Sequence, residues 1–174
     1  MFVKPTVLVL GAGASMQFRF PSGLGLLQQM QSWQSSNPLH FLGISDDDLR
    51  NFAIALHLSG HFSVDAFLEQ RPEFTGIGKS AIAYFLVGNE NAVNLSEHEV
   101  GGEANWYRHL LNLMVGTFDD FAKNKLAVIT FNYDRSFEQF LFIALTHRFN
   151  KGPKEVADAI ATIPIIHVHG QIGL

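Results

Sequence analysis

Thr6-Val7-Leu8-Val9-Leu10, followed directly by Gly11-Ala12-Gly13, is the stretch of sequence that decides the fold. A short continuous apolar run is typical of a strand covered on both faces, and the glycines after it indicate a tight turn. Residues 126–131 and residues 163–168 repeat this pattern of an apolar run that ends in polar residues. Only helical patterns lie between the three predicted strands, which favours parallel strands joined by helical crossovers. We therefore expect an α/β fold, a three-layer Rossmann-like parallel sheet with helices on both faces.

The helices between the strands are predicted from apolar side chains spaced three or four positions apart. Ser45 and Asp48 have the spacing of a capping box at the start of one helix, and Ser63 is placed to cap another. A longer helix is predicted over residues 106–121. The polar, glycine-containing interval 88–102 indicates a surface loop, which could be a solvated connector or a lid.

The composition excludes several classes of protein. The chain has 174 residues and no cysteine, so a disulfide scaffold and any cysteine-ligated zinc or iron–sulfur site are excluded. With a formal net charge of -4 and no long run of Lys and Arg, nothing in the chain marks a nucleic-acid or anionic membrane partner. No stretch reaches the ~18 uninterrupted apolar residues of a membrane span. We expect a cytoplasmic protein with no direct nucleic-acid or membrane partner.

Polar residues and glycines follow each predicted strand. Ligands of open parallel sheets bind beyond the carboxyl ends of the strands, and these ends share one edge, so we expect the three groups to meet there. A glycine turn lets backbone N–H groups approach a pyrophosphate, and a helix N-terminus directly after it would favour the negative charge. The residues at these strand ends, and hence the candidates for ligand contact, are Gly11, Ala12, Gly13, Ala14, Ser15, Thr130, Asn132, Asp134, His169 and Gly170.

Two glycine motifs are incomplete. The dinucleotide fingerprint G-x-G-x-x-G would need a glycine where this chain has Met16, so the first turn could also be a sharp strand-to-helix turn without a ligand. Residues 76–80, Gly-Ile-Gly-Lys-Ser, imitate the end of a phosphate-binding P-loop. Glu73 stands where that motif needs glycine and no strand precedes it, so we predict a helix there, with Lys79 in solvent.

Together, residues 11–15, Thr130-Phe131-Asn132-Tyr133-Asp134 and His169-Gly170 resemble the three sequential signatures of the sirtuin-like superfamily. The closer resemblance is to the sirtuin-like NAD-hydrolysing domains of bacterial anti-phage defence proteins, to which Pro21-Ser22-Gly23 and residues 63–68 are also similar. The resemblance implies a single NAD-binding domain over residues 1–174, with NAD as its substrate.

The resemblance also implies a role for each matched residue. The glycine turn and Ser15 would hold the phosphates and ribose of NAD, and Asn132 would contact the nicotinamide ribose or the attacking water. Asp134 would support the local geometry, and His169 would be the catalytic base. The implied activity is NAD glycohydrolysis, which cleaves the nicotinamide–ribose bond to give nicotinamide and ADP-ribose.

Other functions and other roles for the same residues stay open. Sirtuin deacylases carry a four-cysteine zinc module that this chain lacks, which disfavours protein deacylation and favours glycohydrolysis. A sirtuin-type deacylase or ADP-ribosyltransferase is the second possibility. A nucleotide-sensing or assembly module without turnover is a third possibility. His169 could simply donate to a backbone carbonyl, and Asp134 could only cap the helix after it. His167 and His169 are two apart on a strand, as in a metal pair, but no third ligand is evident and we expect no metal.

The last predicted strand lies close to the end of the chain, because only four residues follow Gly170. A dinucleotide-binding sheet places its first strand centrally, between the second strand and a later one. We therefore expect the chain to be truncated after its third strand, with the C-terminal remainder of the same protein as its partner. An uncovered strand over residues 6–10 would be adhesive, which predicts a homo-oligomer.

Overall fold

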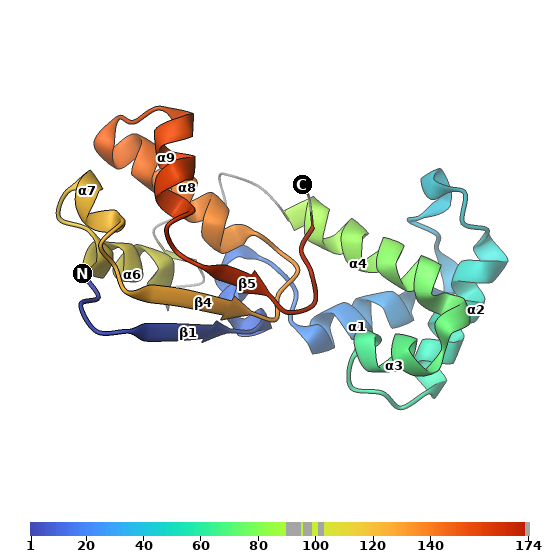
Figure 1. Cartoon of the computed structure of the whole chain (residues 1–174). Coiled ribbons are helices and arrows are strands. Elements are labelled where there is room, and N and C mark those ends of the chain that lie inside the picture. The colour runs from blue at the N-terminus through green and yellow to red at the C-terminus, as the bar shows by residue number, and fades with distance from the viewer. Residues whose placement is uncertain (90–94, 96–98, 101–102, 173–174) are drawn as a thin grey trace. The chain divides into compact units, whose positions relative to one another are not determined.

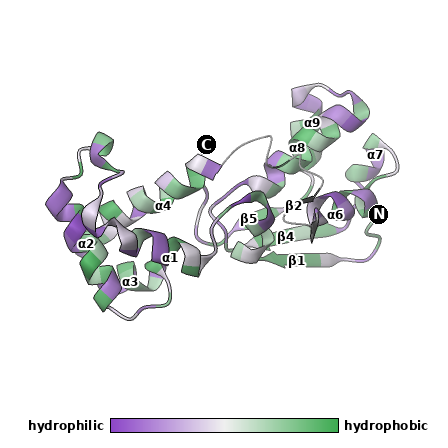
Figure 2. Ribbon diagram, turned by 180° about the vertical axis from the view of Figure 1, so that it is seen from behind, coloured by the Kyte–Doolittle hydropathy of each residue, from purple (hydrophilic) through white to green (hydrophobic). Residues whose placement is uncertain are grey.

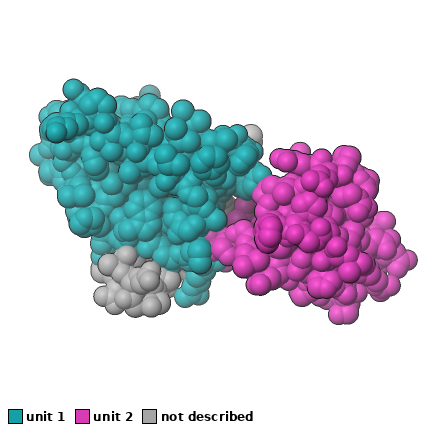
Figure 3. All heavy atoms as spheres, turned by 90° about the horizontal axis from the view of Figure 1, so that it is seen from below, with its two compact units in different colours: residues 1–19, 90–174 teal, residues 20–89 magenta. Residues whose placement is uncertain are grey.

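The computed structural model describes residues 1–89, 95, 99–100 and 103–172. Figure 3 colours its two compact units, which are Met1–Arg19 with Glu90–Leu174 (unit 1) and Phe20–Asn89 (unit 2). The sequence predicts one domain, and the structure divides the chain into these two units. Most of the predicted surface loop over residues 88–102 lies outside the described residues. The short strand β2 (Glu99–Val100) is described within this interval, and β3 (Glu103–Ala104) follows it.

Unit 1 contains a parallel sheet of three strands in the order β1, β4, β5 (Figure 1). Strand β1 spans Thr6–Leu10, β4 spans Leu126–Thr130 and β5 spans Ile165–His167. The three predicted strands and their parallel arrangement are confirmed. Strand β5 is shorter than predicted and begins directly after Pro164, which has no backbone N–H to donate to a neighbouring strand.

Helices of unit 1 cover one face of this sheet. Around a small cavity on that face, Tyr107 and Phe137 lie beside Leu10 and Val128. The helices of unit 1 are α6 (Trp106–Met114), α7 (Phe118–Phe121), α8 (Ser136–Phe149) and α9 (Pro153–Ile160).

The opposite face of the sheet is exposed and apolar. Val7 and Val9 of β1 are 57% and 65% exposed, and Ile166 of β5 is 54% exposed. The pairing register places all three on one side of the sheet, and Figure 2 shows β1 in the green of hydrophobic residues. The prediction that β1 is covered on both faces is therefore wrong for the described residues of unit 1.

The direction of the chain explains why one face is covered. Connections between parallel strands are almost always right-handed. Both connections here move the same way across the sheet, from β1 to β4 and then from β4 to β5. They therefore place their helices on the same face. Among the described strands β1 is an edge strand, whereas the Rossmann-like expectation places it in the centre.

The predicted single helix over residues 106–121 is wrong, because the structure contains two helices there. Val115 has the extended backbone angles φ -129° and ψ 132°, which end α6. Thr117 then begins α7, and its backbone N–H donates to Asp120 Oδ2 at 2.9 Å. A local cap at Thr117 therefore overrides the apolar spacing that continues through the break.

Unit 2 is helical, and its serines cap its helices as predicted. The side chain of Ser45 accepts from the backbone N–H of Asp48 at 3.1 Å, and that of Ser63 accepts from Ala66 at 3.2 Å. Its core is aromatic, with Trp33 stacked on Phe85 at 5.0 Å between ring centroids. The helices of unit 2 are α1 (Gly23–Gln31), α2 (Asp46–Leu58), α3 (Val64–Gln70) and α4 (Thr75–Asn89).

The second glycine motif lies within helix α4, as predicted, with Lys79 exposed. Gly78 is buried, and a Cβ built on it would lie 2.6 Å from both terminal methyl carbons of Leu68 in α3. A Cβ on Gly76 would meet nothing within 4 Å. Gly78 therefore serves the packing of α3 against α4.

Within the part of the chain that the structure describes, every helix falls short of the length and apolar character that crossing a membrane requires.

Candidate functional site

The first strand ends in a glycine turn, here defined as residues 11–15. It contains the short 3-10 helix η1 (Ala12–Ala14) and is followed by a second one, η2 (Met16–Phe18), and the next α-helix begins only at Gly23, in unit 2. The expected helix N-terminus directly after the turn is therefore wrong. Gly11 and Gly13 are exposed, and a Cβ on either would meet no atom within 4 Å. The outer surface of the turn is open, so its backbone is accessible to a ligand.

Ser15 joins the glycine turn to the end of the second strand. Its hydroxyl donates to Asp134 Oδ2 at 2.9 Å and accepts from the side-chain amide of Asn132 at 3.2 Å. These contacts connect residues that are 119 and 117 positions apart in the sequence. Three of the predicted site residues are thereby brought together. Ser15 is only 1% exposed, so its hydroxyl is buried and joins the glycine turn to Asn132 and Asp134 instead of facing solvent.

Asp134 is buried and supports two segments at once. Its Oδ2 accepts from Ser15, and its Oδ1 accepts from the backbone N–H of Ser136 at 3.1 Å, at the start of α8. The N-cap of α8 is Arg135, so the alternative role of Asp134 as the N-cap of this helix is wrong, and the two contacts of Asp134 instead support the local geometry. Beside it, the phenol of Tyr107 and the hydroxyl of Ser136 form a hydrogen bond of 2.8 Å. Burial raises the pKa of Tyr107 above its usual range, so this phenol stays protonated.

Trp106, the first residue of helix α6, contacts the glycine turn through its side chain. Its indole N–H donates to the carbonyl of Ala14 at 2.9 Å, across 92 positions of sequence. In the sequence Trp106 is only the first residue of the helix predicted over residues 106–121. The available signal is that a buried indole N–H needs an acceptor, although the identity of that acceptor depends on tertiary structure.

His169 lies at the third strand end and is exposed. Its ring is 5.8 Å from the ring of Phe131 and 6.2 Å from that of Tyr133, the two neighbours of Asn132 in the chain. Among the described residues, no hydrogen bond joins the His169 ring to Asn132 or to the glycine turn. Gly170 follows with φ +87°, a left-handed conformation that glycine adopts without strain.

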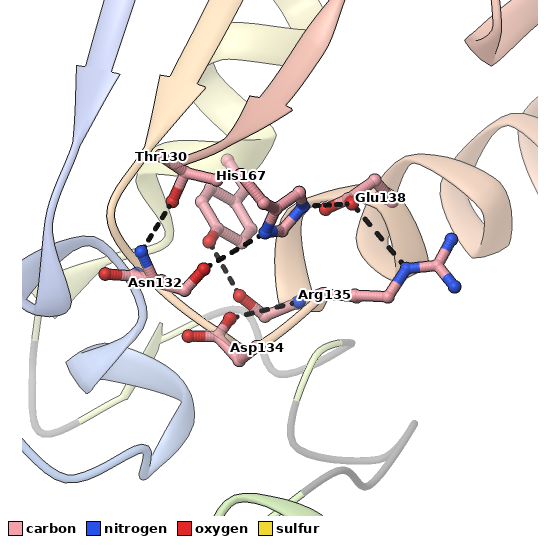
Figure 4. Close-up of polar contacts among 8 residues, drawn as sticks. Thr130, Asn132, Asp134, Arg135, Glu138 and His167 are labelled. Atoms are coloured by element: carbon pink, nitrogen blue, oxygen red, sulfur yellow. Dashed lines mark hydrogen bonds and ion pairs between the residues drawn. The ribbon is translucent and has the colours of Figure 1, made fainter. Parts of the chain in front are cut away.

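The side chain of His167 links the end of the third strand to Asn132, which follows the second strand, and to helix α8. Its Nδ1 is 3.0 Å from the backbone oxygen of Asn132, and its Nε2 is 2.9 Å from Glu138 Oε1 (Figure 4). The sequence predicts no role for His167 or Glu138 beyond the alternative of a metal pair. The His167 ring is engaged by these two groups, and the described residues contain no cluster of three or more His, Asp or Glu side chains that could hold a metal ion.

A cavity of ≈ 10 Å³ lies beneath this edge of the sheet. Thr130, Asn132, Asp134 and Glu138 are among the residues that line it. Its volume and polar lining suit one water molecule. A dinucleotide is far larger and would have to lie on the open, outer side of the glycine turn.

Comparison of the chain with models of known protein families, with curated protein sequences and with solved structures finds no match. The geometry of this edge and the three motifs that form it are therefore the observations from which a function is inferred.

Proposed function

We propose that this chain is an NAD glycohydrolase domain that converts NAD and water to nicotinamide and ADP-ribose. The observation that carries the proposal is the junction of the glycine turn with Asn132 and Asp134 through Ser15, at the carboxyl edge of a parallel sheet. This is the edge at which open parallel sheets bind nucleotides. The order of the motifs along the chain, which resembles that of sirtuin-like domains, adds support.

The residues present fit NAD in three respects. The exposed backbone of Gly11 and Gly13 offers an unobstructed surface to a pyrophosphate. Asn132 presents a carboxamide with both a donor and an acceptor, one of which already reaches Ser15. His169 supplies an exposed imidazole at the same end of the sheet.

The proposed reaction needs little more than positioning and one base. Water attacks the ribose carbon that bears nicotinamide, the bond from that carbon to the ring nitrogen breaks, and nicotinamide leaves as a neutral molecule. Asn132 orients the water or the ribose, and His169 accepts the proton that the water loses. The charge that develops on the sugar resembles that in glycoside hydrolysis. Positioning and acid–base roles of this kind are each worth about 10²–10⁴-fold in rate.

The two histidines at the end of the third strand, His167 and His169, have different roles in the proposed reaction. Both ring nitrogens of His167 lie within hydrogen-bond distance of other groups, and its side chain is only 6% exposed. His169 is exposed, and its ring contacts are aromatic. His169 is therefore the imidazole that can reach a bound ligand, as a base must.

We also propose that the chain belongs to a three-layer Rossmann-like domain of a larger cytoplasmic protein that acts in anti-phage defence. The exposed face and the open edge of β1 are where a further strand and helix of that protein would pack. A second copy of the chain could use the same edge, giving a homo-oligomer.

Light scattering distinguishes these cases: Val9→Lys should shift a self-associated chain towards monomer, and a monodisperse wild-type monomer would refute self-association through β1.

The activity is tested by incubating the purified protein with NAD and following nicotinamide release with and without an acylated peptide. Asn132→Ala and His169→Ala should each lower peptide-independent release by about 10²–10⁴-fold. His147→Ala, which alters an exposed histidine on α8, is the matched control and should leave release unchanged. Peptide-dependent release would instead indicate a deacylase or transferase, and binding without release a sensing module.

Binding of NAD can be measured separately from its hydrolysis, through the NMR signals of the tryptophan side chains. The protein has two tryptophans, and the indole N–H of Trp106 is bonded to the glycine turn. NAD bound over the turn should shift the Trp106 indole resonance and leave that of Trp33 in place. If NAD at millimolar concentration shifts neither resonance, NAD does not bind at this turn.

A further inference from the structure

His167 connects the third strand to both the second strand end and helix α8. Its side chain is 6% exposed, and its ring lies between two oxygen atoms, the backbone oxygen of Asn132 at 3.0 Å and Glu138 Oε1 at 2.9 Å. The contacts span 35 and 29 positions of sequence. A carbonyl oxygen can only accept, so the Nδ1 atom of His167 carries the hydrogen that forms the first bond.

The bond from His167 completes a clamp on the backbone of Asn132. The backbone N–H of Asn132 donates to Thr130 Oγ1 at 3.1 Å, and its carbonyl accepts from His167 (Figure 4). With both backbone polar groups engaged, the peptide planes on either side of Asn132 are held. The direction in which its side chain leaves the backbone, towards Ser15, is then defined.

Glu138 in turn holds the imidazole. Its side chain is 14% exposed and its Oε1 also lies 3.7 Å from Arg135 Nε. Glu138 bonds the second ring nitrogen, either by accepting from an N–H there when its carboxyl is ionised or by donating to the bare nitrogen when it is protonated. Either bond fixes the rotation of the histidine ring, as the orienting group of a catalytic triad does. Here the first ring nitrogen faces the backbone of Asn132 rather than the exposed surface, so His167 cannot serve as the base.

We infer that His167, oriented by Glu138, is a positioning residue that aims the Asn132 carboxamide. Its effect on the rate rests on the proposed function, whereas its effect on the Asn132 side chain does not. A misplacement of about 1 Å at a positioning group can lower a rate by about 10²-fold. The loss should appear in kcat, with KM nearly unchanged, because Asn132 orients the reacting groups rather than holding the phosphates.

Two substitutions separate the two bonds of the ring. In His167→Asn the amide nitrogen replaces Nδ1 and keeps the donor to the Asn132 carbonyl, while the bond to Glu138 is lost. In His167→Gln the amide nitrogen replaces Nε2, so the bond to Glu138 is kept and the donor to Asn132 is lost. His167→Ala removes both, and His147→Asn and His147→Gln are exposed controls on α8.

The first measurement is independent of NAD. In ¹H–¹⁵N spectra the side-chain NH₂ signals of Asn132, assigned as those lost in Asn132→Asp, should shift or broaden in His167→Gln and His167→Ala. They should stay close to the wild-type positions in His167→Asn. Unchanged Asn132 signals in a folded His167→Gln protein would overturn the inference, whether or not the wild type hydrolyses NAD.

The second measurement uses nicotinamide release. His167→Gln and His167→Ala should lose about 10- to 100-fold in kcat with KM within about three-fold, and His167→Asn should restore most of what His167→Ala lacks. Equal losses in His167→Asn and His167→Gln would indicate a merely structural histidine and would also overturn the inference. A wild type that releases no nicotinamide refutes the proposed function alone, and the spectra then decide the role of His167.

Discussion

The hydrogen bond between Ser15 and Asp134 should be the main energetic link between the glycine turn and the second strand end. It joins a hydroxyl that is 1% exposed to a carboxylate that is 7% exposed, at 2.9 Å. Hydrogen bonds to charged groups contribute about 1.5–3 kcal/mol, and a buried polar group left without a partner costs about 1–3 kcal/mol. The test is a double-mutant cycle with Ser15→Ala and Asp134→Ala.

The expected loss of unfolding free energy in each variant depends on how many hydrogen-bonding groups lose their partner. Asp134→Ala leaves the Ser15 hydroxyl and the Ser136 N–H without their acceptor, so we expect a loss of about 3–5 kcal/mol. Ser15→Ala leaves the Asp134 carboxylate and the Asn132 amide each one bond short, a loss of about 2–3 kcal/mol. Once Asp134 is absent, the Ser15 hydroxyl can turn to the Ala12 carbonyl, 3.4 Å away, and removing it then costs only about 1 kcal/mol. The coupling free energy should therefore be about 1.5 kcal/mol.

The assay is urea unfolding followed by tryptophan fluorescence. Trp33 lies in unit 2 and Trp106 in unit 1, so a Trp33→Phe background leaves Trp106 as the reporter of the unit that holds the site. The exposed pair Lys151 and Glu155, with a separation of 2.9 Å, is the control cycle in the same unit and should show no measurable coupling. Additivity of the Ser15 and Asp134 variants within about 0.5 kcal/mol would refute the reasoning.

Three further predictions concern stability. Because burial raises the pKa of Tyr107 from 10.0, its contribution is present below pH 10 and is lost at higher pH, as the unfolded phenol ionises. Tyr107→Phe should thus lose about 1 kcal/mol at pH 7, and this deficit should shrink above pH 10 in urea titrations; a constant deficit would contradict it. The hydrogen bond from Lys123 lowers the pKa of Asp120 from 3.8 to about 2, so its contribution is present above pH 4 and is lost as the pH falls towards 2. The Tm of Asp120→Asn should lie below that of the wild type at pH 6 and converge with it near pH 2; a gap that widens with acid would refute the assignment. Gly76→Ala should raise the unfolding free energy by up to about 1 kcal/mol, whereas Gly78→Ala should lower it by about 1–2 kcal/mol, because its new methyl group meets α3; equal effects in thermal unfolding would contradict the packing role of Gly78.

Part of the candidate site was predictable because strand ends carry their polar residues with them. The parallel arrangement places the carboxyl ends of β1 and β4 side by side, so a meeting of residues 11–15 with Asn132 and Asp134 could be expected before any coordinates. Which atoms would meet was not predictable. The contacts of Ser15 span 117 and 119 positions, and their distances depend on how two loops close.

Because such contacts depend on the tertiary structure, the roles of His167 and Glu138 were not predicted from the sequence. The spacing of His167 and His169 suggested a shared face, but β5 ends at His167 and the chain turns at Gly170, so their rings lie in different surroundings. Glu138 reads locally as an acidic residue in the first turn of a helix. Its bond to His167 exists only because α8 packs beside the end of β5.

The amino-acid sequence by itself determined the local elements of this protein, because apolar runs, caps such as Ser45 and Ser63, and glycine turns act within a few residues. Tertiary structure alone decided that one face of the sheet stays exposed at Val7 and Val9, and that His167 faces Glu138. The physical reason is range: a cap or an apolar period is satisfied by near neighbours. The covering of a sheet face and the partner of a buried imidazole depend on the direction in which the chain returns.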